Sequence, residues 1–194
     1  APEHPFPASV DDCLSFYKNL LTLGYDANNI IFAGDSAGGN LTLTTLIQIR
    51  YQILPSPVAA ILISPATDVT ESGFDMMAEN HDKDPLFVEH ALKSLVDNYT
   101  QSKVSITNKL VSPLLDSLKD LVPLQFHVGS TELLLNNSVL ANSKATEAGT
   151  DSQIIIWHEM PHAHPILTWL PESEHAIDLM AEFMENNWDD CQIV

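Results

Sequence analysis

Apolar and polar residues follow one another along the chain in two kinds of segment. Short, almost wholly apolar runs lie at 29–35, 58–64, 124–129 and 153–158. Between them are longer stretches in which apolar residues recur every three or four positions, the period of an amphipathic helix. Strands that are apolar on both faces are typical of a parallel sheet that helices cover on both sides. The pattern therefore predicts an α/β fold whose functional residues gather in loops at the carboxyl ends of the strands.

The helical segments and their limits follow from the same pattern. We predict helices over residues 9–23, 37–51, 86–100, 137–148 and 172–187. Ser9 and Asp12 should form a capping box at the start of the first helix, and Gly24 should end it. Residues 66–85 are polar and lack a clear period, so we expect irregular structure there. The 194 residues are of ordinary length for one domain, so we expect a single α/β domain over 1–194.

Composition and charge indicate which binding partners to expect and where in the cell the protein is located. The net charge is −18, from 26 acidic residues against 8 lysines and arginines. Such a surface repels nucleic acid and anionic membranes, so we expect neither as a partner. The apolar runs are far shorter than the roughly 18 residues of a membrane span, and no basic, then hydrophobic segment opens the chain. We therefore predict a cytoplasmic protein. Cys13 and Cys191 lack metal or redox spacing, so we predict free thiols, with one disulfide between them as the alternative.

The first candidate for chemistry is the pentapeptide Gly34-Asp35-Ser36-Ala37-Gly38, which fits the pattern G-x-S-x-G. It lies between a predicted strand and a predicted helix, the context of a nucleophile elbow. There the serine occupies a sharp turn that exposes its hydroxyl, and the two glycines leave room for neighbouring backbone. The Ala37 amide, at the helix N-terminus, would donate to a developing oxyanion. A glycine-rich turn that holds phosphate is the alternative, and the charge of Asp35 argues against it.

Several blocks of the sequence, in this order, resemble the hormone-sensitive-lipase-like branch of the α/β-hydrolases. They are APEHPFPASVDD at 1–12, GDSAGGNL at 34–41, SPATD at 64–68 and SPLLDSLKDLVPLQFHVGSTELLLNNS at 112–138. The resemblance implies an α/β-hydrolase fold and a carboxylic-ester hydrolase that uses a serine, an acid and a histidine. It also implies short acyl esters as small-molecule substrates, and neither a cofactor nor a metal.

The acid of such a site should follow the strand at 124–129. An activated serine needs a base within hydrogen-bond reach, and the base needs an acid to orient it. In α/β-hydrolases the chain order is serine, then acid, then histidine. Glu132 is the carboxylate left in the block where the family has its acid, so we predict Glu132, with Asp116 and Asp120 as lesser substitutes. A glutamate that only stabilises the first turn of a helix is the structural alternative.

The base should lie in WHEMPHAH, residues 157–164, after the last predicted strand. The family has there a methionine, one further residue and a histidine, and this resemblance places the base at His162. His158, at the strand end, is expected to be structural. His164 occupies a position that is usually aromatic in the family, and it is left open whether His164 can replace His162.

The same segment also fits the H-E-x-x-H pattern of zinc proteases. That chemistry needs a helix, so that His158 and His162 share one face. Pro161 removes an amide and disfavours helix before it, and the β-branched run before His158 favours a strand that leads into a loop. We therefore predict no metal site here.

The resemblance begins part of the way along the family's length. Family members have an earlier segment with the first strands, much of the lid and a His-Gly-Gly-Gly-type loop that supplies oxyanion-hole amides. Without it, the strand at 29–34 is predicted to be an exposed apolar edge of the sheet. Either a missing N-terminal segment or a second copy, in a homo-oligomer, is expected to pair there.

Two functions are therefore weighed. The first is a carboxylesterase that acts through Ser36, Glu132 and His162, with the Ala37 amide in the oxyanion hole. The alternative is a non-catalytic fragment or subunit of an α/β-hydrolase that acts by association with another chain.

Overall fold

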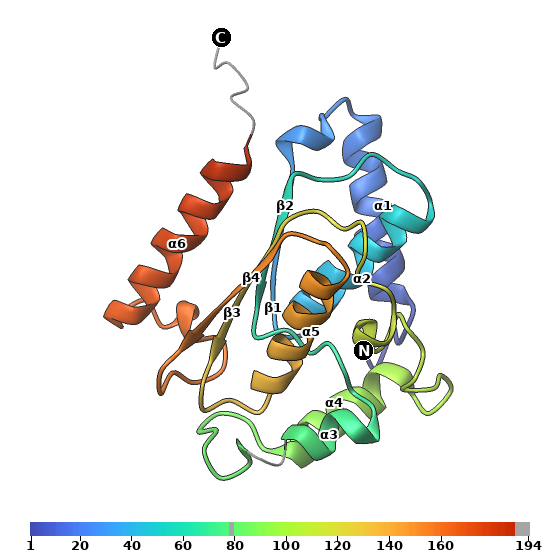
Figure 1. Ribbon diagram of the computed structural model, residues 1–194. Helices are drawn as coiled ribbons and strands as arrows, with labels where there is room; N and C mark the ends of the chain where they lie inside the picture. Colours follow the sequence, from blue (N-terminus) through green and yellow to red (C-terminus); the bar gives the residue numbers. More distant parts are fainter. Residues whose placement is uncertain (78–79, 189–194) are drawn as a thin grey trace.

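The strands form one parallel sheet, as the apolar runs predict. The structure is a computed structural model that describes residues 1–77 and 80–188. The sheet has the order β1-β2-β3-β4, with strands at β1 (Ile31–Asp35), β2 (Ala59–Ile63), β3 (Leu124–Gly129) and β4 (Ser152–Trp157). Asp35 is in register with Ile63, and Gly129 is in register with Trp157. The carboxyl ends of all the strands therefore meet at one edge of the sheet (Figure 1).

Helices cover both faces of the sheet, which confirms the predicted α/β class (Figure 1). The helices in these layers are α1 (Ala8–Thr22), α2 (Ala37–Tyr51), α5 (Leu135–Glu147) and α6 (Pro171–Asn187). On one face, apolar side chains of α2 and α5 pack with Leu62 and Phe126, and α1 packs outside α2. On the other face, Met180 and Phe183 of α6 pack with Ile61. The sheet is thus buried from both sides, which explains its apolar strands.

Two further helices lie beyond the carboxyl ends of the strands (Figure 1). They are α3 (Glu71–Met77) and α4 (Glu89–Thr100). Phe74 and Met77 of α3 and Leu92 of α4 share a core cluster with Leu133, in the loop after β3. The prediction of irregular structure over residues 66–85 is therefore wrong in part. Helix α3 is too short to show a period in the sequence, and burial of its apolar residues stabilises it.

The predicted C-terminal end of α1 is confirmed, and the predicted cap at its N-terminal end is wrong. Gly24, with φ of +92°, directly follows the C-cap residue Leu23, as predicted. The capping box is wrong, because Pro7 is the N-cap residue and no side chain caps the helix. Ser9 lies inside the first turn, and its hydroxyl donates to the Tyr99 hydroxyl at 3.4 Å.

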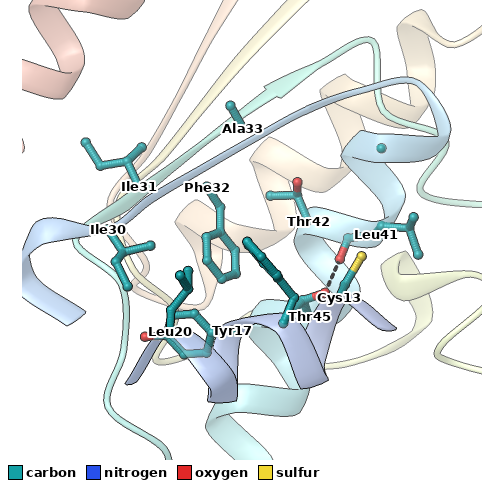
Figure 2. A pocket seen from close by; sticks show the side chains of 12 residues that line it. Cys13, Tyr17, Leu20, Ile30, Ile31, Phe32, Ala33, Leu41, Thr42 and Thr45 are labelled. Atoms are coloured by element: carbon teal, nitrogen blue, oxygen red, sulfur yellow. Dashed lines mark hydrogen bonds between the residues drawn. The ribbon is translucent and has the colours of Figure 1, made fainter. Parts of the chain in front are cut away.

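The outer side of β1 is open among the described residues, as predicted. Strand β1 is at the end of the sheet and pairs with β2. A groove of about 380 Å³ runs beside it, between α1, β1 and the first half of α2 (Figure 2). Its lining is mostly apolar and includes Phe16, Leu20 and Phe32, and it reaches Gly38 in the serine elbow. The open flank of the sheet therefore extends to the predicted nucleophile.

Cys13 lines the β1 groove, and Cys191 lies outside the described residues, so their state stays a prediction. No helix in the described part of the chain has both the length and the apolar character to cross a membrane.

Candidate active site

Ser36 occupies the sharp turn that the G-x-S-x-G pattern predicts between β1 and α2. Its φ is 53° and its ψ is −115°, a conformation that is unfavourable for a residue with a Cβ. The Ser36 amide donates to the carbonyl of Ile63 at 2.8 Å, and the Ser36 carbonyl accepts from the amide of Ala66 at 3.2 Å. These bonds to the last residue of β2 and to the loop after it hold the strained turn in place.

The close approaches at the elbow involve Gly34 and Gly39. A Cβ at Gly34 would overlap the carbonyl of Gly38, and one at Gly39 would lie 2.7 Å from Cβ of Pro65. A Cβ at Gly38 would meet only Oδ1 of Asp35, at an ordinary 3.9 Å. The prediction that Gly38 leaves room for neighbouring backbone is therefore wrong. Gly39 has that role, because α2 passes over Pro65 there.

The N-terminus of α2 opens into an apolar cleft. Ser36 makes no side-chain capping bond, so its hydroxyl is not committed to the helix. Ala37 is exposed at the first position of α2, where amides have no partner within the helix. Ser36 and Ala37 line a cleft of about 340 Å³ together with Val69, Leu92 and Val96. A carbonyl bound in this cleft would meet both the hydroxyl and the helix N-terminus.

Glu132 and His162 form a buried hydrogen-bonded pair. His162 Nδ1 lies 2.8 Å from Glu132 Oε2, and both side chains are almost completely buried. The other carboxylate oxygen, Oε1, accepts from the Ser64 hydroxyl at 2.8 Å and from the Gly129 amide. The buried carboxylate is therefore fully occupied by donors, as burial of a charged group requires.

Contacts from the segment that leads into α4 hold this pair from the outside. The ring of Phe87 packs edge to face on the His162 ring, with centroids 4.6 Å apart. Asp84 accepts from the amide of Leu133 at 2.8 Å, and Asn80 donates to the carbonyl of Glu132 at 3.1 Å. The sequence patterns do not point to Phe87 or Asn80, because neither belongs to a motif with chemistry of its own.

His164 lies only two positions from His162 but in a different environment. It is fully buried beside Trp157, with ring centroids 5.1 Å apart, and neither of its ring nitrogens has a hydrogen-bond partner among the described residues. Burial lowers the pKa of His164 to about 4, against a small opposing effect of Glu172. Glu132 therefore pairs with His162 and not with His164.

The lesser candidates for the acid lie elsewhere. Asp116 accepts from the Tyr51 hydroxyl at 2.6 Å. Tyr51 is the last residue of α2, whose 15 residues place it about 20 Å from the elbow at the other end of the helix. Burial opposes ionisation of Asp116, but the hydrogen bonds from Tyr51 and Ser117 and the nearby positive charges together outweigh it and lower its pKa. Asp120 is exposed.

The H-E-x-x-H segment forms a turn after β4, as its proline predicts. His158 was expected to be structural, but its side chain is 88% exposed, while His162 is buried against Glu132. The described residues contain no cluster of three or more His, Cys, Asp or Glu side chains that could hold a metal ion.

The elbow and the acid–base pair lie at the same edge of the sheet. Ser36 bonds to Ile63 and Ala66, and Ser64 between them contacts Glu132. In the described part of the chain no hydrogen bond joins Ser36 to His162.

Comparison with known proteins identifies the family. The family model described as alpha/beta hydrolase fold matches residues 1–166. The chain is 33% identical over 184 residues to an esterase of Acinetobacter venetianus, covering 94% of this chain and 60% of that protein. It is also 33% identical over 187 residues to an acetyl-hydrolase of Streptomyces hygroscopicus, covering 94% of this chain and 61% of that protein.

Solved structures agree with the sequence relatives. A crystal structure of an esterase from the bacterial hormone-sensitive lipase family matches with a TM-score of 0.92 at 35% identity, over 97% of this chain and 63% of that one. The esterase EstE5, in a crystal soaked with p-nitrophenyl butyrate, matches with a TM-score of 0.88 at 38% identity and the same coverage. The chain thus spans about three fifths of the length of these relatives, and it belongs to the α/β-hydrolase fold family, in the branch of hormone-sensitive lipase.

Proposed function

We propose that this chain carries the catalytic residues of a carboxylic-ester hydrolase, with Ser36 as nucleophile, His162 as base and Glu132 as orienting acid. The observation that carries the proposal is the buried Glu132–His162 hydrogen bond beside a strained serine elbow. The names of the relatives, an esterase and an acetyl-hydrolase, support the same chemistry.

The residues divide the reaction into two steps. Ser36 Oγ attacks the ester carbonyl carbon while its proton passes to Nε2 of His162, and the Ala37 amide donates to the developing oxyanion. His162 then gives the proton to the departing alkoxide, which leaves as the alcohol. His162 next takes a proton from the water that attacks the acyl-serine, and returns it to Ser36 Oγ as the bond to the acyl carbon breaks and the carboxylic acid leaves. Glu132 holds Nδ1–H throughout, so Nε2 stays free to accept the proton.

The substrate class follows from the cleft beside Ser36. Its walls are apolar, and its volume of about 340 Å³ is enough to hold the acyl group of an ester. The soaking of p-nitrophenyl butyrate into a relative supports a short acyl chain. We therefore propose short-chain acyl esters. The cytoplasmic location and the single domain over 1–194 stay predictions from the sequence.

The test of the esterase function uses p-nitrophenyl acetate and butyrate. The kcat for hydrolysis should fall about 10⁶-fold in Ser36→Ala, because loss of the nucleophile alone has an effect of this size in a serine hydrolase. A fluorophosphonate probe with mass mapping should label Ser36. Equal rates in the two proteins, or labelling at another residue, would refute the proposal.

A second candidate function rests on the open edge of β1. Its apolar groove favours pairing of residues 29–34 with either an N-terminal segment of a longer protein or a second copy of the chain. Intact mass of the source protein and light scattering of the purified chain test this association. A monomer of the source protein without an additional N-terminal segment would contradict both versions.

A further inference from the structure

We propose that Ser64 is a positioning residue whose hydroxyl locks the acid to the loop that carries the base. The inference rests on the proposed esterase function and assigns to this chain a fourth polar side chain in the same machinery. Ser64 lies directly after β2, at the carboxyl edge of the sheet, and is fully buried.

The backbone around Ser64 is fixed on both sides. The Ser64 amide donates to the carbonyl of His127 in β3 at 2.8 Å, and the neighbouring Ile63 carbonyl accepts from the Ser36 amide at 2.8 Å. Ser64 therefore sits between the nucleophile elbow and the strand that leads to the acid. Its φ of 46° turns the chain out of the strand at this point.

The Ser64 hydroxyl closes a ring of hydrogen bonds. It donates to Glu132 Oε1 at 2.8 Å and accepts from the Ala163 amide at 3.1 Å. Ala163 directly follows His162, whose Nδ1 lies 2.8 Å from Glu132 Oε2. One hydroxyl thus contacts the acid and the backbone of the base loop at the same time.

This ring restricts both partners of the acid–base pair. Because Oε1 of Glu132 is occupied by Ser64 and Gly129, only Oε2 is left for His162, and rotation of the carboxylate would break established bonds. Ala163 has φ of 51°, a strained conformation that the bond to Ser64 holds in place. A hydroxyl that accepts from an amide also becomes a stronger donor to the carboxylate.

A simple packing role predicts a different outcome, and Ser112 provides the matched control. Ser112 is equally buried, and its hydroxyl also links two groups, since it accepts from the Val69 amide at 3.1 Å and donates to the Ile106 carbonyl at 2.7 Å. Ser112→Ala and Ser64→Ala therefore each remove a fully buried hydroxyl that accepts one hydrogen bond and donates another. Only the Ser64 hydroxyl contacts the acid.

The experiment compares these variants in the full-length protein, with p-nitrophenyl butyrate as substrate. Ser64→Ala should lower kcat about 10²-fold with little change in KM, because a small misplacement of catalytic groups has an effect of this size. Ser112→Ala should keep kcat within about threefold of wild type at temperatures where both variants are folded. Equal kcat values in the two variants would overturn the proposal while leaving the esterase function standing.

A second measurement does not depend on turnover. The proton on His162 Nδ1 should give a far-downfield NMR signal, which Ser64→Ala should broaden or abolish and Ser112→Ala should preserve. Ser64→Cys keeps a weak donor, so it should retain part of the signal, and it replaces Ser64→Ala if that variant does not fold. If the signal changes in a protein without esterase activity, the positioning role stands and the proposed function fails. An unchanged signal in both Ser64 variants would refute the role.

Discussion

On one flank of the serine elbow the described residues bury and hydrogen-bond the polar groups, and on the other flank they leave a strand edge and a groove open. On the flank of β2, β3 and β4, both oxygens of Glu132 are hydrogen-bonded and His162 is buried against Phe87. On the flank of β1, a strand edge and an apolar groove of about 380 Å³ remain open (Figure 2).

The comparison indicates that the described residues hold the acid and the base in place without help from another chain. The orientation of the acid and the base depends on contacts within residues 64–163, each with a described partner. The β1 flank offers unpaired backbone and apolar side chains, which favour association in water. The proposed chemistry therefore depends on one flank, and the proposed association depends on the other.

The largest expected effect separates the two histidines of the base loop. His162→Ala should slow fluorophosphonate labelling of Ser36 about 10³-fold, within the usual range for loss of a general base. His164→Phe should slow it less than tenfold, because His164 packs beside Trp157 and does not contact Glu132. Labelling rates with mass mapping measure both. Equal losses in the two variants would contradict His162 as the base, and a larger loss in His164→Phe would assign the base to His164.

The next effect compares one glycine on each flank. Gly129→Ala should lower the free energy of unfolding by about 3 kcal/mol, because its Cβ would overlap the Met160 carbonyl at the start of the base loop. Gly38→Ala should stay within about 1 kcal/mol of wild type, because its Cβ meets only a 3.9 Å contact and alanine favours the helix. Urea unfolding measures both. A large loss in Gly38→Ala would show that the β1 flank is closed.

The dependence of stability on pH should come from the buried histidines on the closed flank. Burial, together with the nearby His164, lowers the pKa of His127 to about 4, and burial lowers that of His164 to about 4. The unfolded chain binds these protons near pH 6.5 and the folded chain does not, so stability is full above pH 6.5 and falls between 6.5 and 4.

The expected loss between pH 7.5 and 5 is at most about 2 kcal/mol per histidine. Thermal unfolding across this range measures it, and His164→Phe should remove about half of the slope. A slope that is unchanged in His164→Phe would contradict the assignment.

The smallest effect concerns the edge of β1. If a second copy pairs there, Ala33→Lys should raise the dissociation constant of the oligomer about tenfold, because a lysine on an edge strand opposes pairing. Ile156→Lys is the matched control, since Ile156 is half exposed on β4, at the other end of the sheet. Sedimentation velocity measures both variants. Equal effects would show that association does not use the β1 edge.

The agreement between sequence and structure is best where local pattern and packing act together. The limits of α2, the positions of the strands and the turn at Ser36 follow from residues close in the chain. The short helix α3, the N-cap of α1 and the exchange of roles between Gly38 and Gly39 depend on contacts with distant residues, such as Pro65. No local pattern contains those contacts.

The sequence by itself determined the α/β class and the serine elbow, because strand period and motif spacing are local properties. The predicted acid and base came from the resemblance to a family. Only the tertiary structure decided that Glu132 contacts His162 while His164 turns to Trp157. It also brought in Ser64, 68 positions from Glu132 and 99 from Ala163. The physical reason is that parallel strands bring their carboxyl ends to one edge, so partners far apart in the chain become neighbours.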